Sequence, residues 1–102
     1  MARVELAPEV ADDFERILDH LESYRVENPG QRIGEIIAAL NVLETNPQIG
    51  RPMANGKREL VIGRRSRAYL ALYRYVPEID IVFVLAIRSQ REAGYAESVE
   101  TG

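Results

Sequence analysis

The apolar residues in the first half of the chain recur at helical spacing. Residues 1–7 contain a short strand-like start, and Pro8 then suits the first turn of a helix, where its missing N–H costs no hydrogen bond. Apolar positions follow every three or four residues as far as Leu21, and a second set runs from Ile33 to Leu43. Asn28-Pro29-Gly30 breaks the first run. We therefore expect a strand and then an antiparallel helical hairpin over residues 8–46.

The periodicity changes in the second half of the chain. Residues 47–57 form a loop rich in proline and glycine, which predicts turns or a mobile recognition loop. Residues 59–62, 69–76 and 79–87 have strand patterns, with a tight turn at Pro77-Glu78. The last strand, IDIVFVLAI, is apolar at nearly every position, so we expect it to be central, with both faces covered.

These elements predict one α+β domain over residues 1–102. The order is β-α-α-β-β-β, in which residues 57–88 form an antiparallel meander and residues 89–102 a C-terminal tail. The helical hairpin must pack on one face of a mainly antiparallel sheet, because the last strand needs a cover. Gly34, Ala38 and Ala39 allow either close packing of this hairpin or self-association as a homodimer.

The net charge of −3 hides an uneven distribution. Residues 1–56 carry five basic and ten acidic side chains, residues 57–91 carry eight basic and three acidic, and the last eleven residues carry three acids and no base. The overall balance argues against a nucleic-acid-binding protein, whereas the local balance does not. The sequence has no cysteine, no secretion signal and no apolar run near the ~20 residues of a membrane span, which favours a cytoplasmic protein.

Arginines form the candidate binding site. Arg64, Arg65 and Arg67 precede the second strand of the meander, and Arg88 and Arg91 follow the third. A meander places the start of its second strand beside the end of its third, so we expect the two groups to meet. Clustered guanidinium groups repel one another unless an anion offsets them. That anion is a phosphate, a partner's carboxylate or one of the chain's own acids, for which the candidates are Glu92, Glu97 and Glu100.

Other chemistry is poorly represented. His20 is the only histidine, and it suits a helix end better than a metal site. Asp12-Asp13 is more typical of a helix N-terminal pair than of metal ligands, and no glycine-rich phosphate loop or nucleophile elbow is present. We therefore expect no metal and no cofactor. Tyr69, Tyr73 and Tyr75 alternate along one strand, where they form half a core or, less readily, a platform for stacking bases.

The sequence resembles the ParE/RelE superfamily of bacterial toxins. The resemblance extends from Val4 to about Tyr95 and depends on five segments in order. These segments are ELAPEVADDFERILDHL, NPQIGRPM, REL at residues 58–60, AYLALYRY and IDIVFVLAIRSQREAGY. It implies the β-α-α-β-β-β fold, a type II toxin–antitoxin module and a cognate antitoxin that wraps the toxin.

The resemblance implies two possible targets. ParE-like members bind DNA gyrase and need no catalytic residues, and this branch fits the chain better. RelE-like members are endoribonucleases that cut messenger RNA on the ribosome. Only Arg88 or Arg91 and Tyr95 match them loosely, and Arg65, Arg88, Arg91 and Tyr95 would carry the reaction. Leu60, Ile62 and Leu70 stand where such enzymes place basic residues, so general acid–base catalysis has no evident source. A third possibility is an inactive member that binds only its antitoxin.

Overall fold

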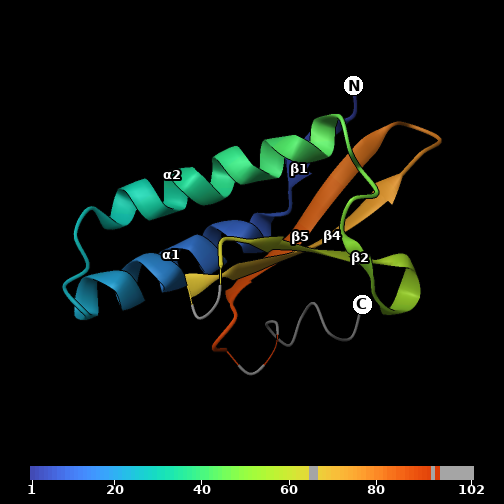
Figure 1. Ribbon diagram of the computed structural model, residues 1–102. Helices are drawn as coiled ribbons and strands as arrows, with labels where there is room; N and C mark the ends of the chain where they lie inside the picture. The colour runs from blue at the N-terminus through green and yellow to red at the C-terminus, as the bar shows by residue number, and fades with distance from the viewer. Residues whose placement is uncertain (65–66, 93, 95–102) are drawn as a thin grey trace.

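Two helices and five strands make up the fold, which a computed structural model describes for residues 1–64, 67–92 and 94 (Figure 1). The expected α+β architecture is confirmed. In chain order the elements are β1 (Arg3–Leu6), α1 (Pro8–Ser23), α2 (Pro29–Leu40), β2 (Arg51–Pro52), β3 (Arg58–Ile62), β4 (Tyr69–Val76) and β5 (Ile81–Ser89), with short 3₁₀ turns at Asn41–Glu44 and Ala54–Gly56.

The sheet has the order β1-β5-β4-β3-β2. Strands β3, β4 and β5 form the expected antiparallel meander, and β1 pairs parallel with β5. The apolar strand β5 is therefore central, as its sequence predicts. Strand β2 was not expected: it adds two residues antiparallel to β3 at the sheet edge, where a proline is tolerated because its nitrogen has no ladder bond to donate.

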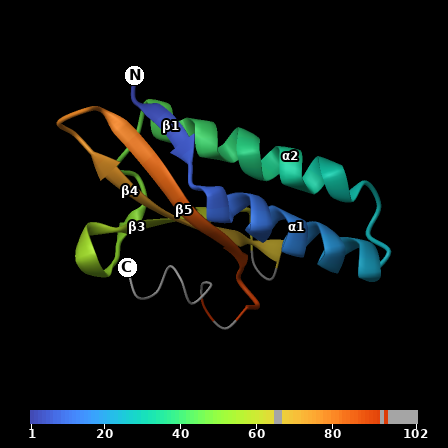
Figure 2. The same ribbon diagram turned by 180° about the vertical axis from the view of Figure 1, so that it is seen from behind.

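Both helices cover the same face of the sheet, as the two opposite views show (Figures 1 and 2). The main core lies beneath them, and its most buried side chains come from both layers: Val10, Ile17, Ile36, Leu40, Leu43, Tyr73, Val82, Val84 and Ile87. A smaller cluster forms on the other face from Leu72, Ala86 and the half-buried Leu85. Apolar side chains of β5 thus pack on both faces, which explains its nearly continuous apolar sequence.

The helix boundaries differ from those expected. Helix α1 ends at Ser23, five residues before the Asn-Pro-Gly sequence, because Arg25 adopts a left-handed φ of 54°. The Arg25 N–H donates to the Glu22 carbonyl and the Val26 N–H to the Leu21 carbonyl, which is a Schellman ending with arginine in the usual glycine position. Pro29 then begins α2 instead of ending α1.

Two later boundaries also move. The expected second helix continued to Leu43, but α2 ends at Leu40 and residues 41–44 tighten into a 3₁₀ turn that still buries Leu43. Strand β5 begins at Ile81 instead of Ile79, because Ile79 and Asp80 belong to the turn after β4, where Asp80 has a φ of 52°. At the other end β5 extends to Ser89, two residues beyond the expected limit.

The small residues of α2 do not serve the hairpin in the expected way. A Cβ at Gly34 would have no heavy atom within 4 Å, and Ala38 is exposed. Gly34 and Ala38 therefore lie on the outer surface of α2 with the exposed Ile37, whereas Ala39 is half-buried.

Candidate functional site: the arginine end of the sheet

The strand register brings the two arginine groups to one end of the sheet. Tyr69 pairs with Ser89 and Leu70 with Arg88, so the start of β4 lies beside the end of β5. One step further, the Gln90 N–H donates to the Ala68 carbonyl at 3.0 Å. Arg67 and Arg91 flank this bonded pair, and the Arg67 N–H donates to the Arg64 carbonyl at 3.2 Å. We call Arg64, Arg67, Arg88 and Arg91 together the arginine end.

The four arginines differ in their surroundings. Arg64, Arg67 and Arg91 are exposed, and their side chains have no hydrogen bond or ion pair with any residue that the structure describes. Arg88 is half-buried and is used within its own turn, since its Nη1 donates to the carbonyls of Ser89 and Glu92. Two of the predicted site residues, Arg65 and Tyr95, lie outside the described residues.

A carboxylate network beneath the arginine end was missed by the sequence analysis. Asp13 is almost fully buried in α1, and its Oδ2 accepts the Ile87 N–H at 2.9 Å. Arg16 donates to Asp13 Oδ1 at 2.6 Å and to the Ile87 carbonyl at 3.0 Å. Strand β1 pairs with β5 only as far as Val84, so these two side chains satisfy the edge of β5 that β1 leaves open.

Glu92 belongs to the same network. Its carboxylate accepts from Arg16 Nε at 2.7 Å and from the Ser89 N–H at 2.6 Å. Glu92 was one candidate to neutralise the arginine cluster, but its carboxylate pairs with Arg16 of α1, and Arg88 donates to its backbone carbonyl. The other two candidates, Glu97 and Glu100, lie outside the described residues.

The electrostatics of Arg16 follow from these contacts. Burial lowers the pKa of Arg16, but hydrogen bonds and charge attraction from Glu92 and Asp13 raise it further, so the pKa lies above its ordinary value. Arg16 is therefore a fixed cation that joins α1, β5 and the turn after β5. Its position in the sequence carries a signal: Asp13 lies on the apolar stripe of α1, where a carboxylate needs a partner, and Arg16 is three residues away.

The tyrosines of β4 belong to the hydrophobic core. The sequence favours this role over a platform for stacking bases. Tyr69 and Tyr73 are buried in the main cluster, and Tyr75 packs against it. The Tyr73 hydroxyl accepts the Gly50 N–H at 2.8 Å, while burial raises the pKa of Tyr73 above its ordinary value. Arg58 Nη1 also donates to the carbonyls of Gln48 and Gly50. These bonds hold the middle of the predicted 47–57 loop against the sheet.

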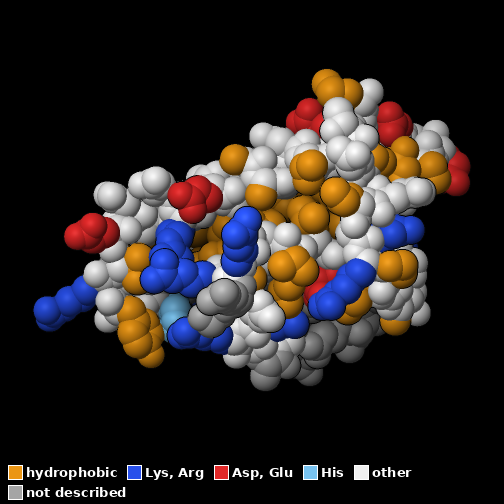
Figure 3. Space-filling view, in the orientation of Figure 1, with side chains coloured by type: hydrophobic (Ala, Val, Ile, Leu, Met, Phe, Trp, Pro, Cys, Tyr) orange, Lys and Arg blue, Asp and Glu red, His pale blue; other side chains and the backbone are white. Residues whose placement is uncertain are grey.

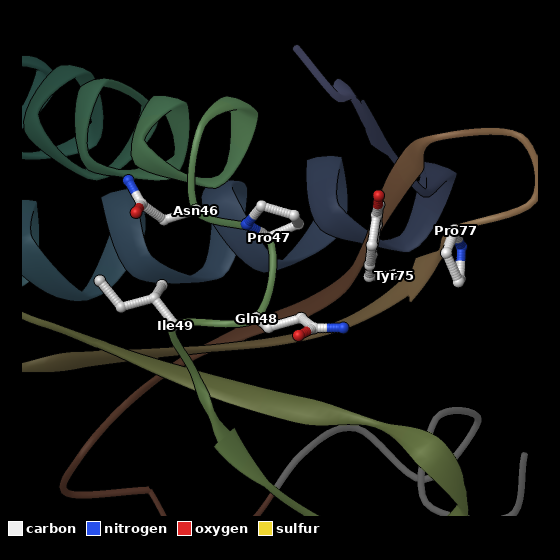
Figure 4. A pocket seen from close by; sticks show the side chains of 6 residues that line it. All are labelled: Asn46, Pro47, Gln48, Ile49, Tyr75 and Pro77. Carbon is white, nitrogen blue, oxygen red and sulfur yellow. The ribbon is translucent and has the colours of Figure 1, made fainter.

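The opposite end of the sheet has a different character. An open hollow of about 570 Å³ is lined by the loop after α2 and the start of the β4–β5 turn (Figure 4). Its lining residues are Asn46, Pro47, Gln48, Ile49, Tyr75 and Pro77. The Tyr75 hydroxyl donates to Asp80 Oδ1 at 2.7 Å, and this hydrogen bond raises the pKa of Tyr75. We call this region, with the exposed Ile79 in the turn, the hairpin end.

Among residues 1–64, 67–92 and 94, no three His, Cys, Asp or Glu side chains are placed to hold a metal ion. His20 lies in the last turn of α1, with its ring centroid 4.7 Å from that of Tyr24. None of the described helices is long and apolar enough to cross a membrane.

Comparisons with known proteins agree with this architecture. The family model described as ParE toxin of the type II toxin-antitoxin system, parDE, matches residues 4–94. A chain of the chromosomal ParDE toxin–antitoxin system from P. aeruginosa is similar, with a TM-score of 0.69 and 22% identity, covering 87% of this chain and 96% of that chain. A chain of the toxin–antitoxin complex RelBE2 from Mycobacterium tuberculosis has a TM-score of 0.56 and 20% identity, covering 87% and 98%.

No match was found among curated proteins. The two solved structures support the fold, whereas the family model spans most of the sequence. The resemblance drawn from the sequence is thereby confirmed. The chain belongs to the ParE toxin family of type II toxin–antitoxin systems.

Proposed function

We propose that this toxin arrests bacterial growth by binding DNA gyrase in the cytoplasm, and that a cognate antitoxin neutralises it. The family supports a ParE-type activity. The observation that carries the proposal is the arginine end, where Arg64, Arg67 and Arg91 are exposed and make no side-chain hydrogen bond or ion pair with the described residues. Such a surface suits recognition of a target without bond breaking.

The geometry favours binding over RNA cleavage. An endoribonuclease needs a proton acceptor beside the reacting hydroxyl and free cations for the phosphate. Glu92 is the described carboxylate nearest in sequence to Arg91, and it is engaged by Arg16 and the Ser89 N–H. Of the residues expected to serve a RelE-like reaction, Arg88 already donates to two backbone carbonyls, and Arg91 is an exposed cation with no described carboxylate paired with it to act as a base. Arg65 and Tyr95 lie outside the described residues.

An antitoxin partner is supported by the similar solved structures, which come from a ParDE toxin–antitoxin system and a RelBE2 toxin–antitoxin complex. This chain also offers apolar surface that a partner would cover, since Ile37, Val42 and Ile49 are exposed along α2 and the loop after it. Figure 3 shows hydrophobic side chains gathered over this part of the molecule. We propose a toxin–antitoxin hetero-oligomer in which this apolar surface and the arginine end are both available to the antitoxin.

A supercoiling assay with purified gyrase tests the proposal. We expect the toxin to inhibit supercoiling and to increase cleaved DNA, and the antitoxin to reverse both effects. The variant Arg67→Gln/Arg91→Gln should weaken inhibition at least tenfold. The control Arg3→Gln/Arg74→Gln removes the same charge away from the arginine end and should leave inhibition unchanged. Normal supercoiling at large toxin excess would contradict the proposal.

Mapping the 5′ ends of transcripts after induced expression separates the alternatives. Intact messages together with growth arrest are expected. Codon-phased cleavage on ribosomes would instead establish a RelE-like endoribonuclease. Unimpaired growth in every host, with the antitoxin still bound, would identify an inactive member of the family.

A further inference from the structure

The arginine end is built from two segments that contain no apolar residue. Residues 63–67 read GRRSR and residues 88–92 read RSQRE. The register of β4 and β5 places Arg67, which comes just before β4, beside the residues that follow β5, where the Gln90 N–H donates to the Ala68 carbonyl. Exposed apolar side chains lie at the hairpin end, where Ile49 is 55% exposed and Ile79 57%, and one also lies beside the arginine end, where Val61 of β3 is 52% exposed.

This composition distinguishes two kinds of partner. The centres of protein–protein interfaces are depleted of charge and contain aromatic or apolar anchors. Contacts to nucleic-acid backbone are made by arginine, serine and glutamine side chains and by backbone N–H groups, which these two segments supply. The two segments of the arginine end therefore suit a phosphate contact that accompanies the protein contact with gyrase, whereas the hairpin end has the apolar character of a protein interface.

Glu92, the described acid nearest in sequence to Arg91, does not neutralise the exposed arginines of the arginine end. The Glu92 carboxylate accepts from Arg16 and from the Ser89 N–H, and it forms no hydrogen bond or ion pair with Arg64, Arg67 or Arg91. Figure 3 shows Lys and Arg side chains in the lower half of one face and acidic side chains mainly along its upper rim. Duplex DNA would therefore be attracted by one side of the molecule and repelled by the other, which orients a protein of net charge −3.

We propose that the arginine end binds the phosphate backbone of duplex DNA, so that the toxin contacts the DNA held by gyrase as well as the enzyme. The biological setting rests on the proposed gyrase function, but the contact itself is a property of the isolated toxin. Guanidinium groups bind phosphate oxygens in a bidentate manner, and the binding needs no base recognition. It is independent of DNA sequence and sensitive to salt.

Fluorescence anisotropy with a labelled 20-base-pair duplex and the purified toxin tests this inference. Three phosphate contacts predict a slope of log K against log salt of about −2.7, or a loss of roughly sixfold for each doubling of salt. Arg67→Gln/Arg91→Gln should reduce the slope by about two and weaken binding at low salt at least tenfold. Arg3→Gln/Arg74→Gln should keep the wild-type slope, and melting curves should show both variants folded.

The outcomes separate this inference from the function on which it rests. No duplex binding at low salt, or equal binding by both double variants, would overturn it even if gyrase were inhibited. Tighter binding to a single-stranded RNA of the same length would also overturn it. Duplex binding with the expected slope in a toxin that leaves gyrase untouched would support the phosphate contact and refute the proposed target.

Discussion

The two ends of the sheet are held in place by different chemistry. At the arginine end, β5 extends beyond β1, and charged side chains of α1 and Glu92 complete its edge. At the hairpin end, tyrosine hydroxyls hold the loop and the turn, through Tyr73 to Gly50 and Tyr75 to Asp80. The first end presents cations supported by ion pairs, and the second presents apolar side chains supported by hydrogen bonds of tyrosine hydroxyls. Charge, salt and pH should therefore act on the two ends separately.

The largest effect is expected from removing the buried carboxylate of Asp13. Asp13→Ala leaves the buried Ile87 N–H without its acceptor and Arg16 without one of its two acids, which should cost about 2–3 kcal/mol of unfolding free energy. Asp12→Ala is the matched control, since Asp12 is exposed beside it and should change stability by less than about 0.5 kcal/mol. Urea denaturation measures both. Equal stability of the two variants would mean that the network of Asp13, Arg16 and Glu92 does not stabilise the arginine end.

At the other end, Gly50 should tolerate no side chain. A Cβ there would lie 2.7 Å from the Tyr73 ring and hydroxyl and 2.9 Å from the Glu59 carbonyl, so Gly50→Ala should cost about 1–3 kcal/mol. Gly34→Ala is the control, because its Cβ would enter open space within α2 and should stabilise the helix by up to about 1 kcal/mol. The melting temperature should fall for Gly50→Ala and rise for Gly34→Ala. If Gly50→Ala leaves the melting temperature unchanged, the loop does not pack closely against Tyr73.

The ion pair between Arg16 and Glu92 should give a smaller effect. Glu92→Gln keeps an acceptor for the Ser89 N–H but loses the charge, and both partners are partly exposed, so we expect a cost of about 0.5–1 kcal/mol. The cost should shrink in 1 M salt, because salt screens exposed charges. Faster amide exchange at Ser89 would show that the turn bearing Arg91 loosens. Glu5→Gln, which breaks the exposed Arg3–Glu5 pair, should leave that exchange unchanged.

These differences mark what the sequence could predict. The meeting of the arginine groups follows from the meander alone, since antiparallel register needs only strand order and a tight turn. The apolar run of β5 likewise predicts its central place. The role of Asp13 depends on where β1 stops and where α1 crosses β5, and the strand and helix patterns determine neither point. The Gly50–Tyr73 contact joins a loop to a strand 23 residues later, and residue spacing alone carries no signal for such a contact.

Ionisation of Tyr73 should leave the unfolding free energy unchanged at neutral pH. In alkali, however, it should separate the behaviour of the two ends of the sheet most clearly. The folded protein raises the pKa of Tyr73, chiefly through burial, so it holds that proton more tightly than the unfolded chain does. The stabilisation is complete below the ordinary tyrosine pKa of about 10 and is lost as pH rises through the higher folded value. Unfolding free energy should therefore fall above pH 10, and it should fall less steeply in Tyr73→Phe, measured by urea denaturation from pH 8 to 11. Because Tyr73 lies at the hairpin end, amide exchange should accelerate at Gly50 before it does at Ile87. The reverse order would show that both ends respond to alkali as one unit.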